Sequence, residues 1–340
     1  MKMLKLILCF VSGVLFSGCE DLFVKPATSN QNVEDFEAAW NRINVAYPFL
    51  EYKHIDWDSI FMIYRPRTER AQGDEFYFVL HDLLAELKDG HVYYHTDGGG
   101  EVYPFYPQRH FRVRHAYSPF VVRTYFDREL ILTASGKEEY GILPDNIGYI
   151  FLSSFHEDYL IVEFPNIMQY MIQTKGLIID IRQKVGGTFQ NIRAVVGHFI
   201  DSPFNWPEFY SLGKLYQVDP IQPKGTYTYT KPVVVLINGS TFSAGEITTE
   251  VLKQLPNVTA VGDTTGGGGG AGSSIPPESG SDFRLPSGKL ISVPNSYLAR
   301  YDGQPFEWVG IQPDILIQQT EQDIKDGRDK QLEYAIEMLK

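Results

Sequence analysis

Two short, almost purely apolar runs constrain the fold of this chain more than any other feature. They are GLIIDI at 176–181 and PVVVLI at 232–237, and each precedes a turn rich in Gly or Ser and then a helical stretch. Strands of a parallel sheet that is covered on both faces have this composition, because neither face needs polar side chains. NVTAVGD at 257–263 is predicted as a further strand. The sequence therefore predicts an α/β core.

The region before this core has helical periodicity instead. Phe36, Trp40, Ile43 and Tyr47 share one face of a first predicted helix, and IDWDSIFMIYRPRT (55–68) and DEFYFVLHDLLAELK (74–88) supply two more. Gly90 is predicted to end the third helix as its C′ residue. The predicted organisation is a helical N-terminal subdomain at 33–95, a strand-rich connecting segment at 96–146 and the α/β core at 147–340.

The N-terminus has the pattern of an export signal. Lysines at positions 2 and 5 precede an apolar run at 6–16, which is too short for a permanent membrane span. LFSGC (15–19) resembles a bacterial lipobox, in which cleavage leaves the cysteine as an acylated N-terminus. This predicts a signal peptide at 1–18 and a lipid-anchored tether at 19–32, with Cys19 holding the protein in the cell envelope, either periplasmic or at the outer membrane or surface. A plain secretory signal with a chance cysteine is the alternative.

Composition excludes several other classes. The only cysteines are Cys9 and Cys19, so the exported protein would contain no disulfide. The formal net charge of -12 disfavours nucleic acid as a partner. No group of residues has metal-ligand spacing, and the glycines at 266–270 lack the Lys-Ser/Thr of a phosphate loop. Neither a metal nor a cofactor is expected.

NGSTFSAGE (238–246) is the stretch with the strongest chemical signal. It places Ser243 at the first turn of a helix that follows a buried strand, where ligands of α/β proteins gather. The N–H groups of Ala244 and Gly245 and the helix dipole would stabilise an oxyanion there. The structural alternative is a capping box between Ser243 and Glu246.

Three further stretches could complete a catalytic site. IDIRQKVGG (179–187) could supply a second oxyanion donor from Gly186 or Gly187. LKDGHVYYH (87–95) contains His91, a candidate base for a serine hydroxyl, and PFEWVGIQPDI (305–315) contains Glu307, which could orient that base. Taken singly, these stretches also fit an ordinary turn, a surface histidine and a solvated carboxylate.

Together these motifs resemble the tail-specific, or C-terminal processing, protease family. The set is DGHV, GYIFLSSF, GLIIDIRQKVGG, NGSTFSAGE, VGDTTGGGGG and FEWVGIQPDI, and in order and spacing it covers about residues 34–320. Residues 36–66 also resemble the small domain that precedes the core in the tricorn-type branch. The resemblance implies a crotonase-like α/β core and a peptide or protein substrate.

The resemblance also implies a role for each candidate residue. Ser243 matches the nucleophile, His91 the base of the tricorn-type branch and Glu307 its distant glutamate. Ala244 and one glycine of the Gly186–Gly187 pair match the oxyanion hole. The resemblance thus implies a serine endopeptidase that works through an acyl-enzyme.

The sequence departs from the family at several positions. Gly268 stands where another branch has a lysine base, Gly90 where the tricorn-type branch has a serine, and Lys184 where an asparagine is usual. Residues 100–146 are too few for a PDZ domain, so none is expected. These departures leave open an inactive binding lipoprotein, an esterase that uses the same site, and Lys184 as an alternative base.

Overall fold

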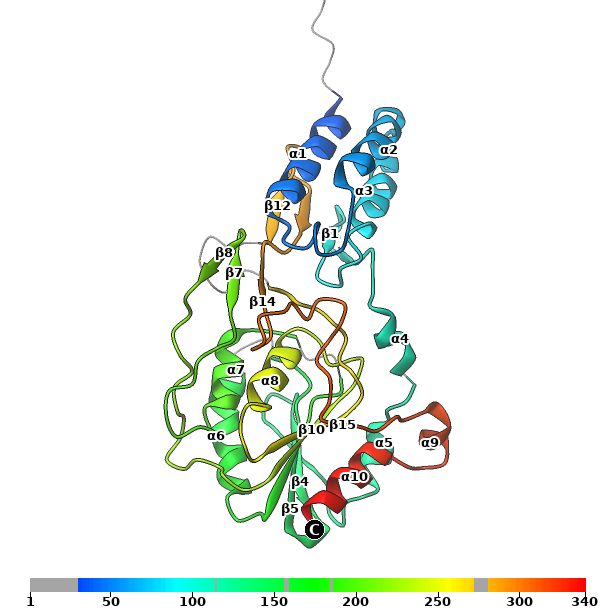
Figure 1. Ribbon diagram of the computed structural model, residues 1–340. Helices are drawn as coiled ribbons and strands as arrows, with labels where there is room; N and C mark the ends of the chain where they lie inside the picture. Colours follow the sequence, from blue (N-terminus) through cyan, green and yellow to red (C-terminus); the bar gives the residue numbers. More distant parts are fainter. Residues whose placement is uncertain (1–29, 114, 156–158, 184–185, 272–280) are drawn as a thin grey trace, which may run out of the picture.

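A seven-stranded sheet forms the centre of the molecule (Figure 1). The computed structural model describes residues 30–340 except 114, 156–158, 184–185 and 272–280. The strand order is β15-β10-β9-β6-β5-β4-β3, in which the first five strands are parallel and the last two antiparallel. The strands are β3 (Ile131–Leu132), β4 (Glu139–Leu143), β5 (Ile147–Phe151), β6 (Gly176–Asp180), β9 (Val233–Ile237), β10 (Val258–Gly262) and β15 (Ile315–Leu316). The predicted parallel core is confirmed.

Helices cover both faces of this sheet. α6 (Tyr159–Met171), α7 (Phe189–Val196) and α8 (Ala244–Leu252) lie on one face, and α5 (Pro119–Arg123) and α10 (Lys330–Leu339) on the other (Figure 1). Alternate residues of β6 and β9 point to the two sides: Ile179 and Val235 pack with the first group, whereas Ile178 and Val234 pack with the second. Because both faces are buried, these strands contain almost no polar residue.

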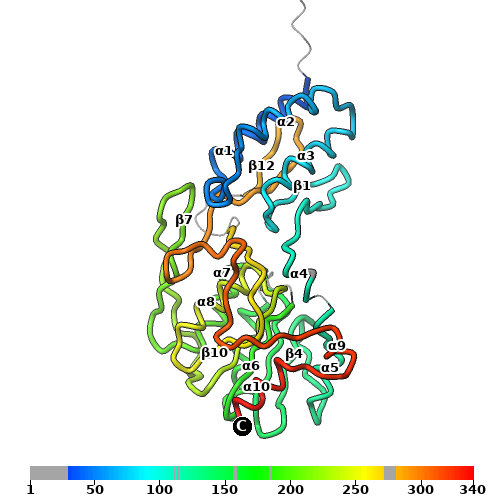
Figure 2. The backbone as a smooth tube through the Cα atoms, turned by 45° about the vertical axis from the view of Figure 1, so that its right-hand side comes forward, coloured from blue at the N-terminus to red at the C-terminus, as the bar shows by residue number. Residues whose placement is uncertain are grey.

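The N-terminal subdomain combines two distant parts of the chain. Its helices are α1 (Gln31–Ala46), α2 (Trp57–Arg70) and α3 (Glu75–Ala85). Its sheet has the order β12-β13-β1-β2, formed by β12 (Asp282–Arg284), β13 (Leu290–Ser292), β1 (Tyr93–His95) and β2 (Glu101–Val102). Figure 2 shows the orange β12 segment among the blue helices. β12 and β13 form a hairpin that lies on this subdomain because β13 pairs with β1.

A third sheet and a few short elements complete the fold. The sheet order is β11-β14-β7-β8, from β7 (Phe209–Ser211), β8 (Lys214–Tyr216), β11 (Gly270–Ala271) and β14 (Ser296–Leu298). The segment expected to be rich in strands, 96–146, also contains the helices α4 (Gln108–Val113) and α5 and the 3-10 turn η1 (Pro144–Asn146). α9 (Glu321–Lys325) precedes the last helix. No helix among the described residues is both long and apolar enough to cross a membrane.

Two helices of this subdomain have different ends from those that the sequence predicts. α1 begins at Gln31 with Asn30 as its N-cap, and Asn32 Nδ2 donates to the Ala71 carbonyl at 2.9 Å. The end of the predicted 19–32 tether therefore belongs to the fold, whereas Cys19 and the signal peptide lie outside the described residues. The third helix ends at Ala85, and Lys88 rather than Gly90 adopts a positive φ, of 47°.

Candidate active site

Two loops that carry candidate residues meet at one edge of the central sheet. β6 and β9 are parallel neighbours, so the loops that follow them leave the sheet on the same side. Thr241 Oγ1 donates to the Ile181 carbonyl at 2.8 Å and joins the two loops directly. The Gly186–Gly187 pair and Ser243 therefore lie at the carboxyl ends of adjacent strands, where α/β proteins bind ligands.

Ser243 has a strained backbone at the start of α8. It is the N-cap of that helix, with φ 55° and ψ -117°, and it is half-buried. A residue with a side chain rarely adopts such a conformation, and strain of this kind clusters at functional sites. Its N–H donates to Glu246 Oε2 at 2.9 Å, which fixes the turn. An ordinary helix cap needs no such strain, so the backbone favours the functional interpretation of Ser243.

Glu246 fastens the glycine-rich loop to the start of α8. This buried carboxylate accepts hydrogen bonds from the N–H groups of Gly267 at 2.7 Å and Gly268 at 2.8 Å, and from Thr265 Oγ1 at 2.5 Å. Burial raises the pKa of Glu246, although these donors and the Ser243 N–H oppose that effect. The sequence predicts only a capping role for Glu246, and its contacts with the glycine loop show a wider structural one.

The glycine loop has no space for the lysine base of the other branch. A Cβ atom on Gly268 would lie 2.2 Å from Phe242 Cζ, and one on Gly266 would lie 2.9 Å from Phe242 Cδ2. The Phe242 ring thus fills the place that a side chain at position 268 would need. The other candidate lysine, Lys184, lies outside the described residues.

Gly268→Ala is expected to destabilise the protein and to reduce its activity. The added methyl group must displace Phe242, and overpacking of this kind costs about 1–3 kcal/mol. Gly98→Ala is the matched control, because its Cβ would meet nothing nearer than Thr96 Oγ1 at 3.9 Å. The melting temperature and the catalytic rate of both variants are the measurements. Equal behaviour of the two variants would show that the Phe242 ring is free to move.

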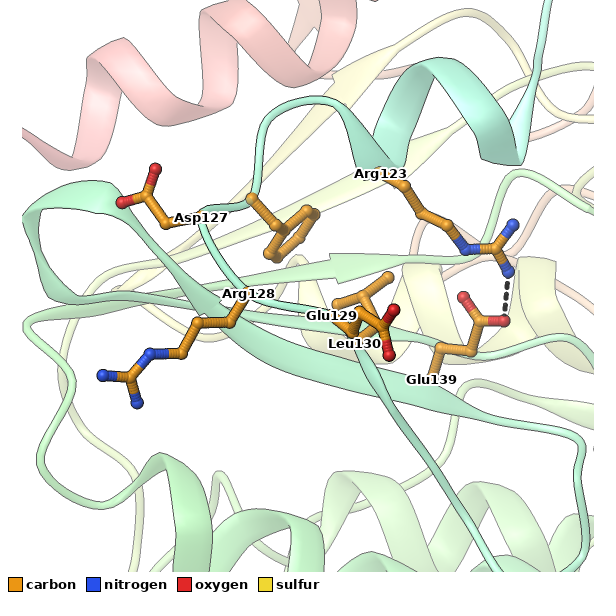
Figure 3. Close-up of a pocket in the computed structure, with 7 residues that line it drawn as sticks. Arg123, Asp127, Arg128, Glu129, Leu130 and Glu139 are labelled. Carbon is orange, nitrogen blue, oxygen red and sulfur yellow. Dashed lines mark hydrogen bonds and ion pairs between the residues drawn. The ribbon is translucent and has the colours of Figure 1, made fainter.

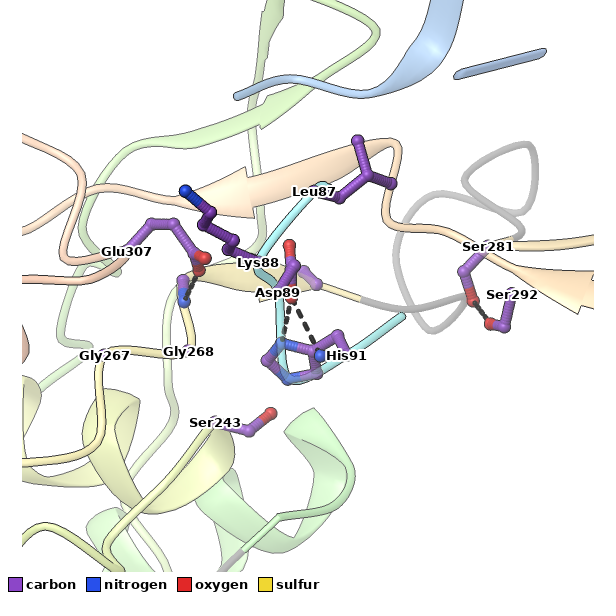
Figure 4. Close-up of polar contacts among 12 residues, drawn as sticks. Leu87, Lys88, Asp89, His91, Ser243, Gly267, Gly268, Ser281, Ser292 and Glu307 are labelled. Carbon is purple, nitrogen blue, oxygen red and sulfur yellow. Dashed lines mark hydrogen bonds and ion pairs between the residues drawn. The ribbon is translucent and has the colours of Figure 1, made fainter. Parts of the chain in front are cut away.

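His91 lies between Asp89 and the loop that carries Ser243. Its ring stacks on Phe242, with ring centroids 4.6 Å apart and an interplanar angle of 28°. The His91 backbone N–H donates to Asp89 Oδ1 at 2.8 Å, and the same oxygen lies 3.6 Å from Nδ1 of the ring. In Figure 4, Asp89 and Ser243 lie on opposite sides of the imidazole. The fold therefore brings His91 to the loop that carries Ser243.

The surroundings of His91 make it more basic than an ordinary histidine. Burial lowers the pKa of His91, but the contact with Asp89 and the charges of Asp89, Glu307 and Glu246 outweigh it, so the pKa is raised. The side chain is 19% exposed, and neither ring nitrogen forms a hydrogen bond within the described part of the chain. Both nitrogens are buried, and Nδ1 lies 3.6 Å from Asp89 Oδ1.

Glu307 lies near this cluster but is bound to another residue. Its Oε1 is 2.6 Å from Lys53 Nζ, and its Oε2 accepts from the Gly269 N–H at 2.7 Å. Burial and the charge of Asp89 raise the pKa of Glu307 to about 7, while Lys53 opposes the shift. The structure therefore places Glu307 behind the candidate base, in an ion pair with a lysine that the sequence analysis did not identify.

The Gly186–Gly187 pair is held in position by Phe155. The Phe155 N–H donates to the Gly186 carbonyl at 2.7 Å, and the Thr188 N–H donates to the Phe155 carbonyl at 2.8 Å. Gly187 has φ 144°, a region that side chains rarely adopt. The role of this pair and of Ala244 as oxyanion donors stays a prediction.

A serine–histidine contact in the same region involves two other residues. Ser240 Oγ is 3.0 Å from His110 Nδ1. Ser240 is only 2% exposed, so a polypeptide substrate could not reach its hydroxyl without a rearrangement. Ser243 is half-buried and thus more accessible to a substrate than Ser240.

Two cavities differ in their relation to this site. One, of about 420 Å³, lies beside the candidate residues and is lined by Lys88, Gly90, Phe105, Pro107, Gln108, Arg109, Arg112, Gly266, Gly267, Glu307 and Trp308. The other, of about 450 Å³, lies near the antiparallel edge of the sheet and contains the Arg123–Glu139 ion pair (Figure 3). Only the first adjoins the candidate residues. Within the described residues, no three His, Cys, Asp or Glu side chains could together hold a metal ion.

Comparison with protein families gives two matches along the chain. The model of peptidase family S41 matches residues 146–317, half of the chain, and that of the tricorn protease C1 domain matches residues 29–85. The first match includes the loops that carry Ser243, Glu307 and the Gly186–Gly187 pair. The second corresponds to the helices of the N-terminal subdomain.

Individual proteins agree with these matches. The carboxy-terminal processing protease CtpB of Bacillus subtilis is 27% identical over 52% of this chain and 35% of its own length. The chain thus spans about a third of that curated relative. A crystal structure of a Parabacteroides merdae protein is 25% identical, with a TM-score of 0.75 over 91% of this chain and 96% of the other. Mature CPAF shares the fold at 15% identity, with a TM-score of 0.65 over 91% and 97% of the two chains.

Proposed function

The chain belongs to peptidase family S41, and we propose that it is a serine endopeptidase of the tail-specific, tricorn-like type that uses Ser243 as its nucleophile. The predicted resemblance to C-terminal processing proteases is confirmed, as is an α/β fold with a helical N-terminal region. The observation that carries the proposal is the strained Ser243 backbone, next to the Phe242 ring on which His91 stacks.

In the proposed reaction, His91 takes the proton of the Ser243 hydroxyl. The Ser243 oxygen attacks the carbonyl carbon of a peptide bond, and His91 then gives the proton to the departing amine. Water attacks the acyl-enzyme in the second half of the reaction, again with His91 as the base. Because His91 must be neutral to accept the proton, its raised pKa moves the rising limb of the rate profile above the ordinary value of about 6.5.

The negative charge of the tetrahedral intermediate needs two donors. Ala244 is the first residue of α8, so its N–H has no carbonyl of an earlier helical turn to which it could donate. The dipole of this nine-residue helix also favours a negative charge at this end. The Gly186–Gly187 pair supplies the second donor from the adjacent strand end. Donors of this kind each contribute about 10²–10³-fold in rate in other serine proteases.

The departures from the family pattern do not favour an inactive protein. A Cβ atom at Gly90 would lie 2.9 Å from Phe242 Cζ, and one at Gly268 would lie 2.2 Å from the same atom. Both glycines therefore accommodate the Phe242 ring beside His91. The site is rearranged around an aromatic residue, and both Ser243 and His91 are retained.

Turnover of an unstructured peptide tests this proposal. The wild-type protein should cleave the peptide, and mass spectrometry of the products should show internal peptide-bond cleavage. An equivalent ester substrate separates an esterase from a peptidase. Cleavage of the ester alone would replace the proposal with esterase activity, and binding without cleavage of either substrate would support a binding lipoprotein.

We also propose that Cys19 anchors the protein in the cell envelope, on the basis of LFSGC. Cys19→Ala should move the protein from the detergent phase to the aqueous phase in detergent partitioning, because the acyl chains provide its only predicted anchor. Mass spectrometry of the wild-type N-terminus should show an acylated Cys19. An unmodified N-terminus at another residue would contradict this assignment.

A further inference from the structure

A cluster of polar side chains is buried directly behind His91. It consists of Tyr47 and Lys53 from the helical subdomain, Asp89 from the turn after α3, and Glu307 from the core. We propose that Asp89 is the carboxylate that positions His91, and that Lys53 and Glu307 hold Asp89 in place. This inference rests on the proposed function and names a positioning residue of the same site.

Asp89 is the carboxylate nearest to the His91 ring among the contacts of the described residues. Its side chain is fully buried, and Oδ1 contacts His91 twice, through the backbone N–H at 2.8 Å and Nδ1 at 3.6 Å. Oδ2 accepts the Tyr47 hydroxyl at 2.8 Å. With both oxygens bound, the carboxylate is fixed with one oxygen toward Nδ1. The 3.6 Å between Oδ1 and Nδ1 is longer than a hydrogen bond, and a small approach of the two atoms would form the bond that selects the tautomer with its proton on Nδ1 and leaves Nε2 as the base.

Lys53 connects this carboxylate to the rest of the cluster. Its buried Nζ donates to Tyr47 Oη at 2.8 Å and to the Leu87 carbonyl at 2.9 Å, and it lies 3.8 Å from Asp89 Oδ2. Its shortest ion pair is with Glu307, at 2.6 Å. A single lysine therefore compensates two buried carboxylates and also fastens the turn that carries Asp89.

The pKa values of the two carboxylates shift in opposite directions. Burial opposes ionisation of Asp89, but Lys53 and His91 outweigh it and hold the pKa of Asp89 well below its usual range. Burial and Asp89 raise the pKa of Glu307 to about 7. Asp89 is thus the carboxylate with the more persistent charge, while both oxygens of Glu307 are bound to Lys53 and the Gly269 N–H.

Gly90 explains why an aspartate can take this role. The tricorn-type pattern has a serine at this position, but a Cβ atom here would lie 2.9 Å from Phe242 Cζ and 3.1 Å from Pro107 Cδ. A serine at position 90 would therefore have to displace the Phe242 ring. Asp89 supplies an oxygen to the histidine from the preceding residue instead.

The pKa of His91, measured by NMR with ¹³C-labelled histidine, tests the inference without requiring turnover. The ionisable groups that raise this pKa are Asp89, Glu307 and Glu246. Asp89→Asn removes the nearest anion, so it should lower the pKa of His91 by about one unit or more. Glu307→Gln should lower it by less than half as much. A larger shift in Glu307→Gln than in Asp89→Asn would overturn the inference.

Kinetics give the second readout. Asp89→Asn should reduce kcat by about 10²–10⁴-fold with little change in KM, because an asparagine no longer selects the productive tautomer. Asp89→Glu should recover part of the loss, and Glu307→Gln should cost less than Asp89→Asn. The rising limb of kcat/KM should move to lower pH in Asp89→Asn. If Asp89→Asn lowers the melting temperature but leaves the pH dependence of kcat/KM unchanged, Asp89 has only a structural role.

The two proposals fail in different ways. If wild-type protein turns over no peptide but Asp89→Asn still lowers the pKa of His91, the proposed function fails and the placement of Asp89 stands. If Ser243→Ala abolishes turnover while Asp89→Asn leaves both the pKa and kcat unchanged, the peptidase stands and the Asp89 inference fails.

Discussion

Ser243→Ala is expected to abolish peptide turnover, with a loss in kcat of about 10⁴–10⁶-fold, and His91→Ala should lose a similar amount. The double variant should be hardly worse than either single one, because a nucleophile without its base and a base without its nucleophile are equally unproductive. The measurement is kcat/KM on one peptide, with melting temperatures to confirm that each variant is folded.

Ser240→Ala is the matched control for this prediction. Ser240 belongs to the same loop and its hydroxyl contacts a histidine, His110, but it is only 2% exposed. It should retain turnover within a few-fold of wild type. Loss of activity in Ser240→Ala with retention in Ser243→Ala would show that Ser240, rather than Ser243, is the nucleophile.

Arg182→Ala is expected to destabilise the protein by about 3–5 kcal/mol, which is the usual loss when one partner of a buried ion pair is removed. The Arg182 side chain is fully buried, with nitrogens 2.6 Å from Asp180 Oδ2 and 2.8 Å from Asp329 Oδ1. It ties the end of β6, which leads to the Gly186–Gly187 pair, to the start of α10. The substitution leaves two buried carboxylates without their cation.

Denaturant unfolding measures this loss, with Arg328→Ala as the control. Arg328 also pairs with a carboxylate, that of Glu333, but its side chain is 56% exposed. Solvent screens such a pair, so the control should leave the free energy of unfolding nearly unchanged. Equal losses in the two variants would show that burial does not decide the strength of the Arg182 pairs.

Local sequence patterns were sufficient to predict the core strands and the helix start at Ser243. β6 and β9 have nearly continuous apolar residues because both of their faces are buried, and this property is visible in the sequence itself. The small residues after β9 likewise indicate a tight turn into α8. The family resemblance added His91 and Glu307, which no local pattern could connect with Ser243.

Contacts between distant segments could not be predicted in this way. Lys53 and Glu307 are separated by most of the chain, and nothing in the sequence around Lys53 indicates that it is buried in an ion pair. The pairing of Tyr93 with Ser292 is equally non-local. Asp89 belongs to the DGHV motif, but its role depends on the orientation of its carboxylate, which only the folded structure determines.

Gly90 has a different role in the structure from the one that the sequence predicts. The sequence predicts a helix-terminating glycine, yet Lys88 adopts the positive φ instead. Glycine is required at position 90 because Phe242 and Pro107 leave no space for a side chain. The requirement comes from tertiary packing around His91.

Covalent labelling with a fluorophosphonate probe tests the central claim most directly. An activated serine oxygen attacks the phosphorus atom and releases fluoride, so the adduct marks the nucleophile, and peptide mass spectrometry locates it. The account predicts a single adduct on Ser243, absent in Ser243→Ala and formed far more slowly in His91→Ala. An adduct on Ser240 or another residue, or unlabelled Ser243 in protein that cleaves peptide, would contradict it.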